Sequence, residues 1–233
     1  MLAVRDLHTY YGDSYVLQGV SLEVEPGRVS VLMGRNGVGK TTLIRSVMSL
    51  TPPRRGSVLL DGKELVGLPA YEVARRGIAL VPQGRRIFKS LTVAEHLDSA
   101  HRKQGEAAWP LERIFELFPP LHGRLGQRAG SLSGGEQSML AIARALRTSP
   151  QCVLMDEPTE GLAPRFVDVV LDVIRELKGQ ADLSLLVVLP DLPLALAVAD
   201  HVSVMRKGQI AFAGTPGELE DRKDIQKQLI GVG

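Results

Sequence analysis

Residues 34–41, GRNGVGKT, fit the pattern G-x-x-x-x-G-K-[ST]. They follow RVSVLM, a short apolar run typical of a strand buried on both faces, and precede the helical pattern TTLIRSVMSL. In such a loop, glycines let the backbone curl so that several N–H groups point at phosphate oxygens. The positive N-terminal end of the following helix adds to this attraction. The stretch therefore predicts a phosphate-binding loop between a buried strand and a helix.

Each position of this loop has an expected role. Lys40 is expected to bridge the β- and γ-phosphates of a nucleotide, and the Thr41 hydroxyl is expected to ligate Mg²⁺. Thr42 is expected to add a further phosphate contact. The remaining loop residues surround the phosphates with their backbone: Gly34, Arg35, Asn36, Gly37, Val38 and Gly39.

A second buried run, CVLMDE at 152–157, ends in two carboxylates. Asp156 suits coordination of Mg²⁺, either directly or through a water molecule. Glu157 is placed to orient or deprotonate an attacking water. Two acids at a strand end are weak evidence alone, because strand ends often meet solvent. Together with the phosphate loop, they predict a nucleotide-hydrolysing site.

LSGGEQ, residues 132–137, predicts a second anion-binding helix end. Ser133 fits a helix N-cap and Glu136 completes a capping box, while Gly134 and Gly135 leave the backbone amides bare. A protein that holds its phosphates with one loop has no evident need for a second such site. The economical explanation is that this helix end faces the nucleotide of another subunit.

The composition is that of an ordinary soluble globular protein, with 44% hydrophobic and 23% charged residues among 233. The net charge of +2 is too small to suggest a nucleic-acid surface, so we expect no nucleic-acid partner. The single cysteine, Cys152, lies in an apolar run and predicts a packed, unreactive thiol. The most apolar stretch, residues 185–200, is interrupted by Pro190, Asp191 and Pro193, so we expect no direct membrane span.

Buried strands alternate with helices along most of the chain, which predicts an α/β fold with a mostly parallel core sheet. Residues 2–7 and 15–24 alternate apolar and polar positions, and a Gly-Asp turn at 12–13 joins them. They are expected to form an N-terminal antiparallel β part. HVSVMRKGQIAFAG, residues 201–214, is expected to form a closing hairpin.

Strand signals vanish in the middle of the chain. LTVAEHL has a capping-box pattern at Thr92 and Glu95, and PLERIFELF, a Pro-Pro with a polar loop, and the long helix EQSMLAIARALR follow. We therefore expect one domain over 1–233 with an inserted helical subdomain. Its predicted parts are a nucleotide-binding core at 1–84 and 150–233, and a helical subdomain at about 85–149.

The combination of these motifs resembles the ATP-binding subunits of ABC transporters. The motifs are the phosphate loop, LSGGEQ and, about twenty positions later, four apolar residues followed by Asp-Glu, and the resemblance covers nearly the whole chain. The resemblance implies the P-loop NTPase fold of an ABC cassette, with ATP and Mg²⁺ as cofactors. It also implies a head-to-tail dimer with two ATP molecules between one subunit's phosphate loop and the other's LSGGEQ.

The resemblance further implies partners and a location. The partners are transmembrane permease subunits, which closure and reopening of the dimer would drive between inward- and outward-facing states. The second ATPase subunit is either the same chain or a sister chain. The protein is then cytoplasmic and peripheral on the inner face of the cell membrane.

Other positions are similar to the family residue by residue. Tyr11 in YYGDSYVL resembles the aromatic residue that stacks on adenine, with Tyr10 as the alternative. Gln83 in VPQGRRIF resembles the glutamine that touches Mg²⁺ and water and links the site to the helical lobe. TEGLAP, residues 159–164, occupies the dimer-communication loop, where many relatives carry a Ser-Ala-Leu-Asp pattern. The candidate Mg²⁺ ligands are therefore Thr41, Gln83 and Asp156.

Three stretches narrow the resemblance: GRNGVGKTT, VPQGRRIF with LTVAEHL, and DEPTEGLAP. They are similar to the smaller ATPase subunit of branched-chain amino acid importers and of the related urea and amide importers. The expected function is the ATP-hydrolysing motor of a small-solute importer. A soluble ABC ATPase of translation or DNA repair is disfavoured, because those proteins usually carry two cassettes or long coiled-coil insertions.

Pro190 departs from the family pattern. In most ABC ATPases a histidine that contacts the γ-phosphate follows the strand equivalent to LSLLVVL, and the A-x-x-x-A-D pattern at 195–200 aligns Pro190 with it. The resembled importers often have glutamine there. Proline offers neither a side-chain donor nor an N–H, and losing an essential donor of this kind commonly costs about 10²–10³ in rate. The alternative function is therefore an ATP-binding regulatory subunit with weak or partner-dependent hydrolysis.

Overall fold

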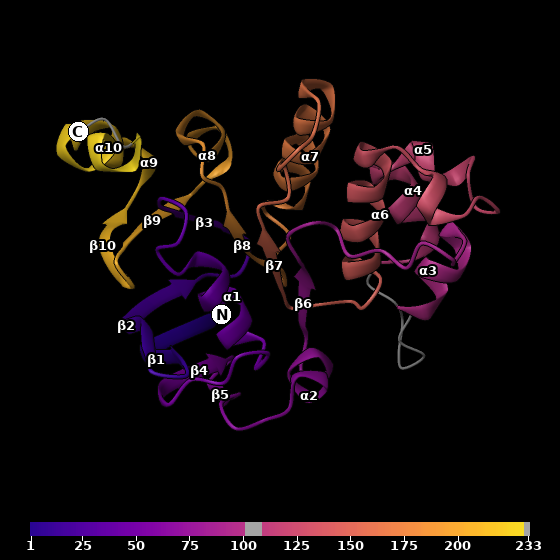
Figure 1. Ribbon diagram of the computed structural model, residues 1–233. Helices are drawn as coiled ribbons and strands as arrows, with labels where there is room; N and C mark the ends of the chain where they lie inside the picture. Colours follow the sequence, from indigo (N-terminus) through magenta and orange to yellow (C-terminus); the bar gives the residue numbers. More distant parts are fainter. Residues whose placement is uncertain (101–108, 231–233) are drawn as a thin grey trace.

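The computed structural model describes residues 1–100 and 109–230, and two β-sheets organise them (Figure 1). The larger sheet has six strands in the order β10-β9-β3-β8-β7-β6. Five of these strands run parallel, and β10 pairs antiparallel with β9 at the edge. The strands are β3 (Val29–Met33), β6 (Ile78–Val81), β7 (Cys152–Asp156), β8 (Ser184–Val188), β9 (His201–Arg206) and β10 (Gln209–Gly214). The predicted mostly parallel core sheet and its closing hairpin are confirmed.

The smaller sheet is antiparallel, with the order β2-β1-β4-β5. β1 (Leu2–Tyr11) and β2 (Ser14–Val24) form the predicted N-terminal hairpin, although β1 extends four residues past the expected end at residue 7. β4 (Arg55–Leu60) pairs with the other side of β1, and β5 (Lys63–Glu64) completes the sheet. The place of β4 in the smaller sheet was not predicted.

Alternate residues of the central strands face two different hydrophobic cores, because successive strand side chains point to opposite faces. Leu32, Leu154 and Leu186 belong to one core, in which α1 (Lys40–Val47) is packed between the two sheets. Figure 1 shows α1 in this position. Both Leu43 and Ile44 of α1 are buried in this core. The phosphate loop, which leads into α1, is therefore fixed to a helix that both sheets hold.

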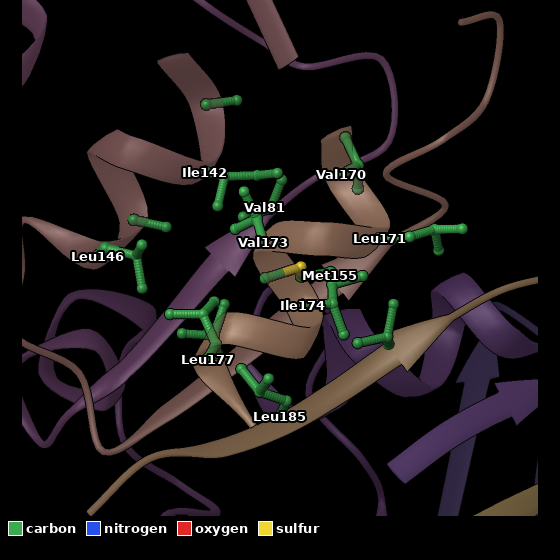
Figure 2. Packing of buried hydrophobic residues seen from close by; sticks show 14 of the residues in the cluster. Val81, Ile142, Leu146, Met155, Val170, Leu171, Val173, Ile174, Leu177 and Leu185 are labelled. Atoms are coloured by element: carbon green, nitrogen blue, oxygen red, sulfur yellow. The ribbon is translucent and has the colours of Figure 1, made fainter. Parts of the chain in front are cut away.

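The opposite face of the large sheet packs against α7 (Pro164–Leu177) and α6 (Gly134–Leu146). Figure 2 shows Met155 of β7 and Leu185 of β8 among the apolar side chains of these helices, such as Ile142 of α6 and Ile174 of α7. Burial of each such side chain stabilises the fold by about 1.5–3 kcal/mol. Cys152 is fully buried, and this burial raises the pKa of its thiol to about 12, as expected for a packed cysteine.

The described residues between 85 and 149 form helices and loops, with one isolated bridge between Thr92 and Arg128. The capping box at Thr92 is confirmed, because its side chain accepts from the Glu95 N–H and the Glu95 carboxylate accepts from the Thr92 N–H.

The expectation that the Pro-Pro pair belongs to a loop is wrong, since Pro119 begins a short helix. Proline suits a first helical turn, where its missing N–H has no partner to lose. The elements are α3 (Val93–Ser99), α4 (Leu111–Leu117), α5 (Pro119–His122), η1 (Ala129–Ser131) and α6. The proposed division into core and helical subdomain stays a prediction.

The apolar stretch at 185–200 is a strand, a short loop and a helix. It runs from β8 to α8 (Leu192–Val198), and Asp191 caps α8 by accepting from the Leu194 N–H at 3.0 Å. Within the described part of the chain, no helix combines the length and the apolar character that a membrane span requires. The remaining helices are α2 (Ala70–Arg75), α9 (Pro216–Asp221) and α10 (Lys223–Ile230).

Candidate nucleotide-binding and hydrolysis site

Four loops that carry predicted site residues leave the large sheet at the same end of its parallel strands. They follow the carboxyl ends of the parallel strands β3, β6, β7 and β8. Carboxyl ends of neighbouring parallel strands meet at the same sheet edge, where α/β proteins bind ligands. The loops carry the phosphate-binding segment 34–39, Gln83, the acids Asp156 and Glu157, and Pro190. The fold therefore brings these predicted positions to one place.

The phosphate loop has backbone angles and close contacts that require glycine. Gly34 has φ 142°, and a Cβ added there would lie 2.5 Å from the Met205 carbonyl oxygen. Gly39 has φ 113° where the loop joins α1. By contrast, a Cβ added at Gly37 would meet nothing within 4 Å, so this part of the loop faces open space. This geometry is consistent with a loop that glycines allow to curl.

Lys40 holds the loop together from inside. Its ammonium is buried and donates to the carbonyl oxygens of Gly34 at 2.9 Å and Arg35 at 3.2 Å. It also lies 3.4 Å from the Glu157 carboxylate. A buried lysine is normally paired, and these partners compensate its charge. An incoming phosphate would therefore compete with Glu157 for the same cation.

Thr41 and Asp156 form the candidate Mg²⁺ position. The Thr41 hydroxyl donates to an Asp156 carboxylate oxygen at 3.3 Å. Burial raises the pKa of Asp156, and the nearby charges of Glu157 and Glu160 raise it further. Among the described residues, no group of three or more His, Cys, Asp or Glu side chains could hold a metal. A hydroxyl and a carboxylate nevertheless fit Mg²⁺, which binds through few protein ligands together with substrate phosphates.

Gln83 contacts two acids at once. Its side-chain amide donates to Glu157 at 3.2 Å and to Glu160 at 2.9 Å. Glu160 belongs to TEGLAP and was not among the predicted site residues, although an acid there is a visible departure from the common Ser-Ala-Leu-Asp pattern. Glu157 has φ 50°, a left-handed conformation that costs a non-glycine residue about 1–3 kcal/mol and is frequent in active sites.

Tyr11 and Tyr10 occupy different environments. The Tyr11 hydroxyl is 3.3 Å from the Thr51 hydroxyl and also interacts with Thr42 on α1, and 46% of the residue is exposed. Tyr10 is stacked on Tyr15, with ring centroids 4.4 Å apart. Tyr11 is therefore the aromatic residue next to the phosphate-binding helix. Its adenine contact stays a prediction, and the geometry favours it over Tyr10.

LSGGEQ begins α6 as predicted. Ser133 caps the helix by accepting from the Glu136 N–H at 3.4 Å, and Glu136 accepts from the Ser133 N–H at 2.8 Å. Glu136 also forms an ion pair with Arg124 at 2.8 Å, so its carboxylate is bound both to the N-cap backbone and to Arg124. Gly135 lies directly under the Phe166 ring. Among the described residues, no hydrogen bond or ion pair joins Ser133, Gly134, Gly135 or Glu136 to the group around Lys40.

The corner after β8 lacks a side-chain donor. Pro190 is exposed two residues after the end of β8, and the neighbouring Asp191 serves as the cap of α8. His201 pairs with Ser30 near the start of β3, which is the sheet edge opposite to the phosphate loop. His201 is the first residue of β9, at the start of the predicted closing hairpin.

A phosphate loop after one buried strand, paired acids after another and a capped LSGGEQ helix define a nucleotide-binding ATPase cassette. The chain belongs to the ABC transporter family, whose model matches residues 17–160. The predicted P-loop NTPase fold and the family resemblance are both confirmed, and binding of nucleotide is a property of this class.

Two relatives cover the full length of the chain. The high-affinity branched-chain amino acid transport ATP-binding protein BraG of Pseudomonas aeruginosa is 37% identical over 99% of this chain and 100% of its own length. A probable branched-chain amino acid transport ATP-binding protein LivF of Archaeoglobus fulgidus is 32% identical over 100% of this chain and 99% of its own.

Two solved structures show the same fold over nearly all of both chains. An ATP-binding subunit of an ABC transporter has a TM-score of 0.86 at 27% identity and covers 99% of this chain and 98% of its own. A nucleotide-free ATP-binding cassette has a TM-score of 0.85 at 27% identity and covers 100% of this chain and 99% of its own.

Proposed function

We propose that this chain is the ATP-hydrolysing motor subunit of an importer for branched-chain amino acids or for related amides or urea. The observation that carries the proposal is the connected group of Lys40, Glu157 and Gln83 at the carboxyl edge of the sheet. The names of the two full-length relatives support the substrate class. Neither of these relatives is described as regulatory, so the alternative of a regulatory subunit gains no support from them.

The proposed roles follow from the contacts. Lys40 and the loop amides bind the β- and γ-phosphates, because a phosphate satisfies this buried cation as the loop carbonyls do now. Thr41 and Asp156 would hold Mg²⁺, which would supply positive charge against the phosphate oxygens. Once Lys40 turns to phosphate, Glu157 is free to orient a water molecule and accept its proton. Gln83 keeps Glu157 and that water in position.

The proposed partner for LSGGEQ is the nucleotide of a second ATPase subunit in a head-to-tail dimer. α6 is 13 residues long, and its first turn offers the amides of Gly134 and Gly135. A helix N-terminus with bare amides attracts phosphate oxygens through its partial positive charge. Because no hydrogen bond or ion pair in the described part of the chain joins this end to Lys40, Glu157 or Gln83, a second subunit accounts for its position.

The proposed permease contact is a groove beside the C-terminal part of α6. A groove of about 470 Å³ between α2, β6, α3 and α6 has mostly apolar walls with Arg86 and Arg144 among them, and Phe88 in its lining is 58% exposed. Exposed apolar grooves of this kind mark protein contacts. We propose that a permease segment docks here and holds the subunit peripherally at the cytoplasmic face of the membrane.

The test is Mg-ATP turnover by wild type, Glu157→Gln and a matched control, Glu116→Gln, which removes one acid on α4 far from this group. We expect Glu157→Gln to abolish turnover while ATP binding, measured by calorimetry, persists. Equal turnover in wild type and Glu157→Gln would overturn the proposed ATPase. The substrate class is tested separately, by uptake of leucine and urea into vesicles that contain the chain with its permease.

A further inference from the structure

The Arg85 side chain joins three segments that the proposed site uses. Arg85 stands two residues after Gln83, and its Nε donates to the Ser138 hydroxyl at 3.1 Å. Its Nη2 donates to the Gly161 carbonyl at 3.4 Å, within TEGLAP. The same guanidinium covers Gly134, where an added Cβ would lie 3.0 Å from Nη1. One planar side chain therefore touches the Gln83 loop, the LSGGEQ helix and the TEGLAP loop.

The backbone around Arg85 is strained. Arg85 has φ 65° and Arg86 has φ 43°, both in the left-handed region that non-glycine residues rarely adopt. Two such residues in sequence are unfavourable, and they persist only where surrounding contacts hold them. Because Arg85 Nε and Nη2 are bound to α6 and TEGLAP, their contacts help to hold this turn.

Helix α6 holds the same turn at a second point. Arg144 Nη1 donates to the Arg86 carbonyl at 3.2 Å, and its guanidinium lies over the Phe88 ring at 5.6 Å. Ser138 and Arg144 are both on α6, the first bound to Arg85 and the second to Arg86. The turn and the helix that carries LSGGEQ are therefore connected by side chains at both ends of the turn.

A cavity lies between the Arg85–Ser138 contact and the carboxylates of Glu157 and Glu160. Its volume is about 280 Å³, and its lining includes Arg85, Ser138, Glu157 and Glu160. The Arg85 guanidinium therefore bridges α6 and the TEGLAP loop along the wall of this cavity, instead of filling a packed core. A guanidinium suits this task because its donors are fixed in one plane and reach two acceptors at once.

We propose that Arg85 is a positioning residue, which fixes the first turn of the LSGGEQ helix and the TEGLAP loop relative to Gln83. In this arrangement, the Gln83 loop fixes Gly134 and Gly161 relative to each other, so that both present one fixed surface to the nucleotide of a second subunit. The same loop contacts Glu157 through Gln83. The inference rests on the proposed function, because LSGGEQ acts on the nucleotide of the other subunit.

The test separates nucleotide binding from dimer formation. Arg85→Ala and Arg85→Lys are made in the Glu157→Gln background, beside Arg76→Ala, which removes an exposed arginine. ATP-dependent dimerisation is measured by sedimentation over a range of protein concentrations, and ATP affinity by calorimetry. We expect both Arg85 variants to weaken dimerisation at least tenfold, while ATP affinity stays within about twofold of the parent. Lysine should fail to rescue, because an ammonium lacks the planar fork that binds Ser138 and Gly161 together.

Ser138→Ala keeps the proposal testable if either Arg85 variant fails to fold. It removes one of the two hydrogen bonds and should weaken dimerisation less than Arg85→Ala, with no further loss in the double variant. Unchanged dimerisation in Arg85→Ala and Ser138→Ala would overturn the inference. An equal loss of ATP affinity and dimerisation would overturn it too, because the role would then be general support of the fold. If the parent neither dimerises nor, with Glu157 restored, hydrolyses ATP, the proposed function itself fails.

Discussion

Gly135→Ala should destabilise the protein through one contact, the Phe166 ring. A Cβ at this position would lie 2.2 Å from two ring carbons, about 1 Å short of the 3.4 Å at which ordinary contact begins. Forcing such a group into packed surroundings costs about 1–3 kcal/mol. Alanine regains up to about 1 kcal/mol over glycine inside a helix, so we expect a net loss of about 1 kcal/mol. For a chain of this size, that lowers the melting temperature by about 2–4 °C.

The assay is thermal and urea unfolding of Gly135→Ala, Phe166→Ala and the double variant. Gly217→Ala is the matched control, because this glycine also lies in a helix and a Cβ there would meet nothing within 4 Å. The double variant should be more stable than the two single losses predict, since removing the ring makes room for the new methyl group. The reasoning is refuted if Gly135→Ala and Gly217→Ala shift stability equally, or if the two losses simply add.

Three further outcomes are expected. Pro190→Gln should raise single-turnover hydrolysis by up to about 10²-fold, since it restores a donor at the corner after β8; an unchanged rate makes proline a tolerated variation. Without Mg²⁺, Asp156→Asn should raise the melting temperature at neutral pH, because burial raises the pKa of this carboxyl and its ionised form costs folding energy. This gain should shrink as the pH falls toward the ordinary range of aspartate, where the folded chain keeps the proton, and a gain independent of pH would contradict the explanation. Tyr11→Ala should weaken ATP binding by about 3–10-fold, from the loss of about 0.5–1.5 kcal/mol of stacking, whereas Tyr10→Ala should not; equal effects in calorimetry would contradict the assignment.

Local signals predicted most of the elements. Continuous apolar runs located the buried strands, and the capping boxes at Thr92 and Ser133 located two helix starts that the structure confirms. Pairing between distant segments was not predictable from such signals. β4 lies beside β1 because of contacts between residues some fifty positions apart, and periodicity says nothing about which strand is the neighbour. The helix at Pro119 was missed because a Pro-Pro pair signals a loop and a first helical turn equally well.

The candidate site likewise contains residues that local sequence predicted and contacts that it did not. Lys40, Thr41, Asp156 and Glu157 were predicted from spacing, because a phosphate loop and a strand-end acid pair follow from local sequence. The contacts of Glu160 and Arg85 were not, because each depends on a loop reaching across from another strand.

The partition of the apolar core has a consequence for how this subunit can be regulated. One hydrophobic core contains residues of α1, which follows the phosphate loop, and of the smaller sheet, which includes Tyr11's strand β1. The other core contains residues of α6, the helix that LSGGEQ begins. In the proposed head-to-tail dimer, affinity for a chain's own nucleotide and readiness to engage a neighbour's nucleotide would thus depend on separate sets of packed residues. Substitutions in one core can change the lifetime of the closed dimer without changing how strongly each subunit holds ATP. Two otherwise similar subunits could therefore differ in cycle time at equal ATP occupancy.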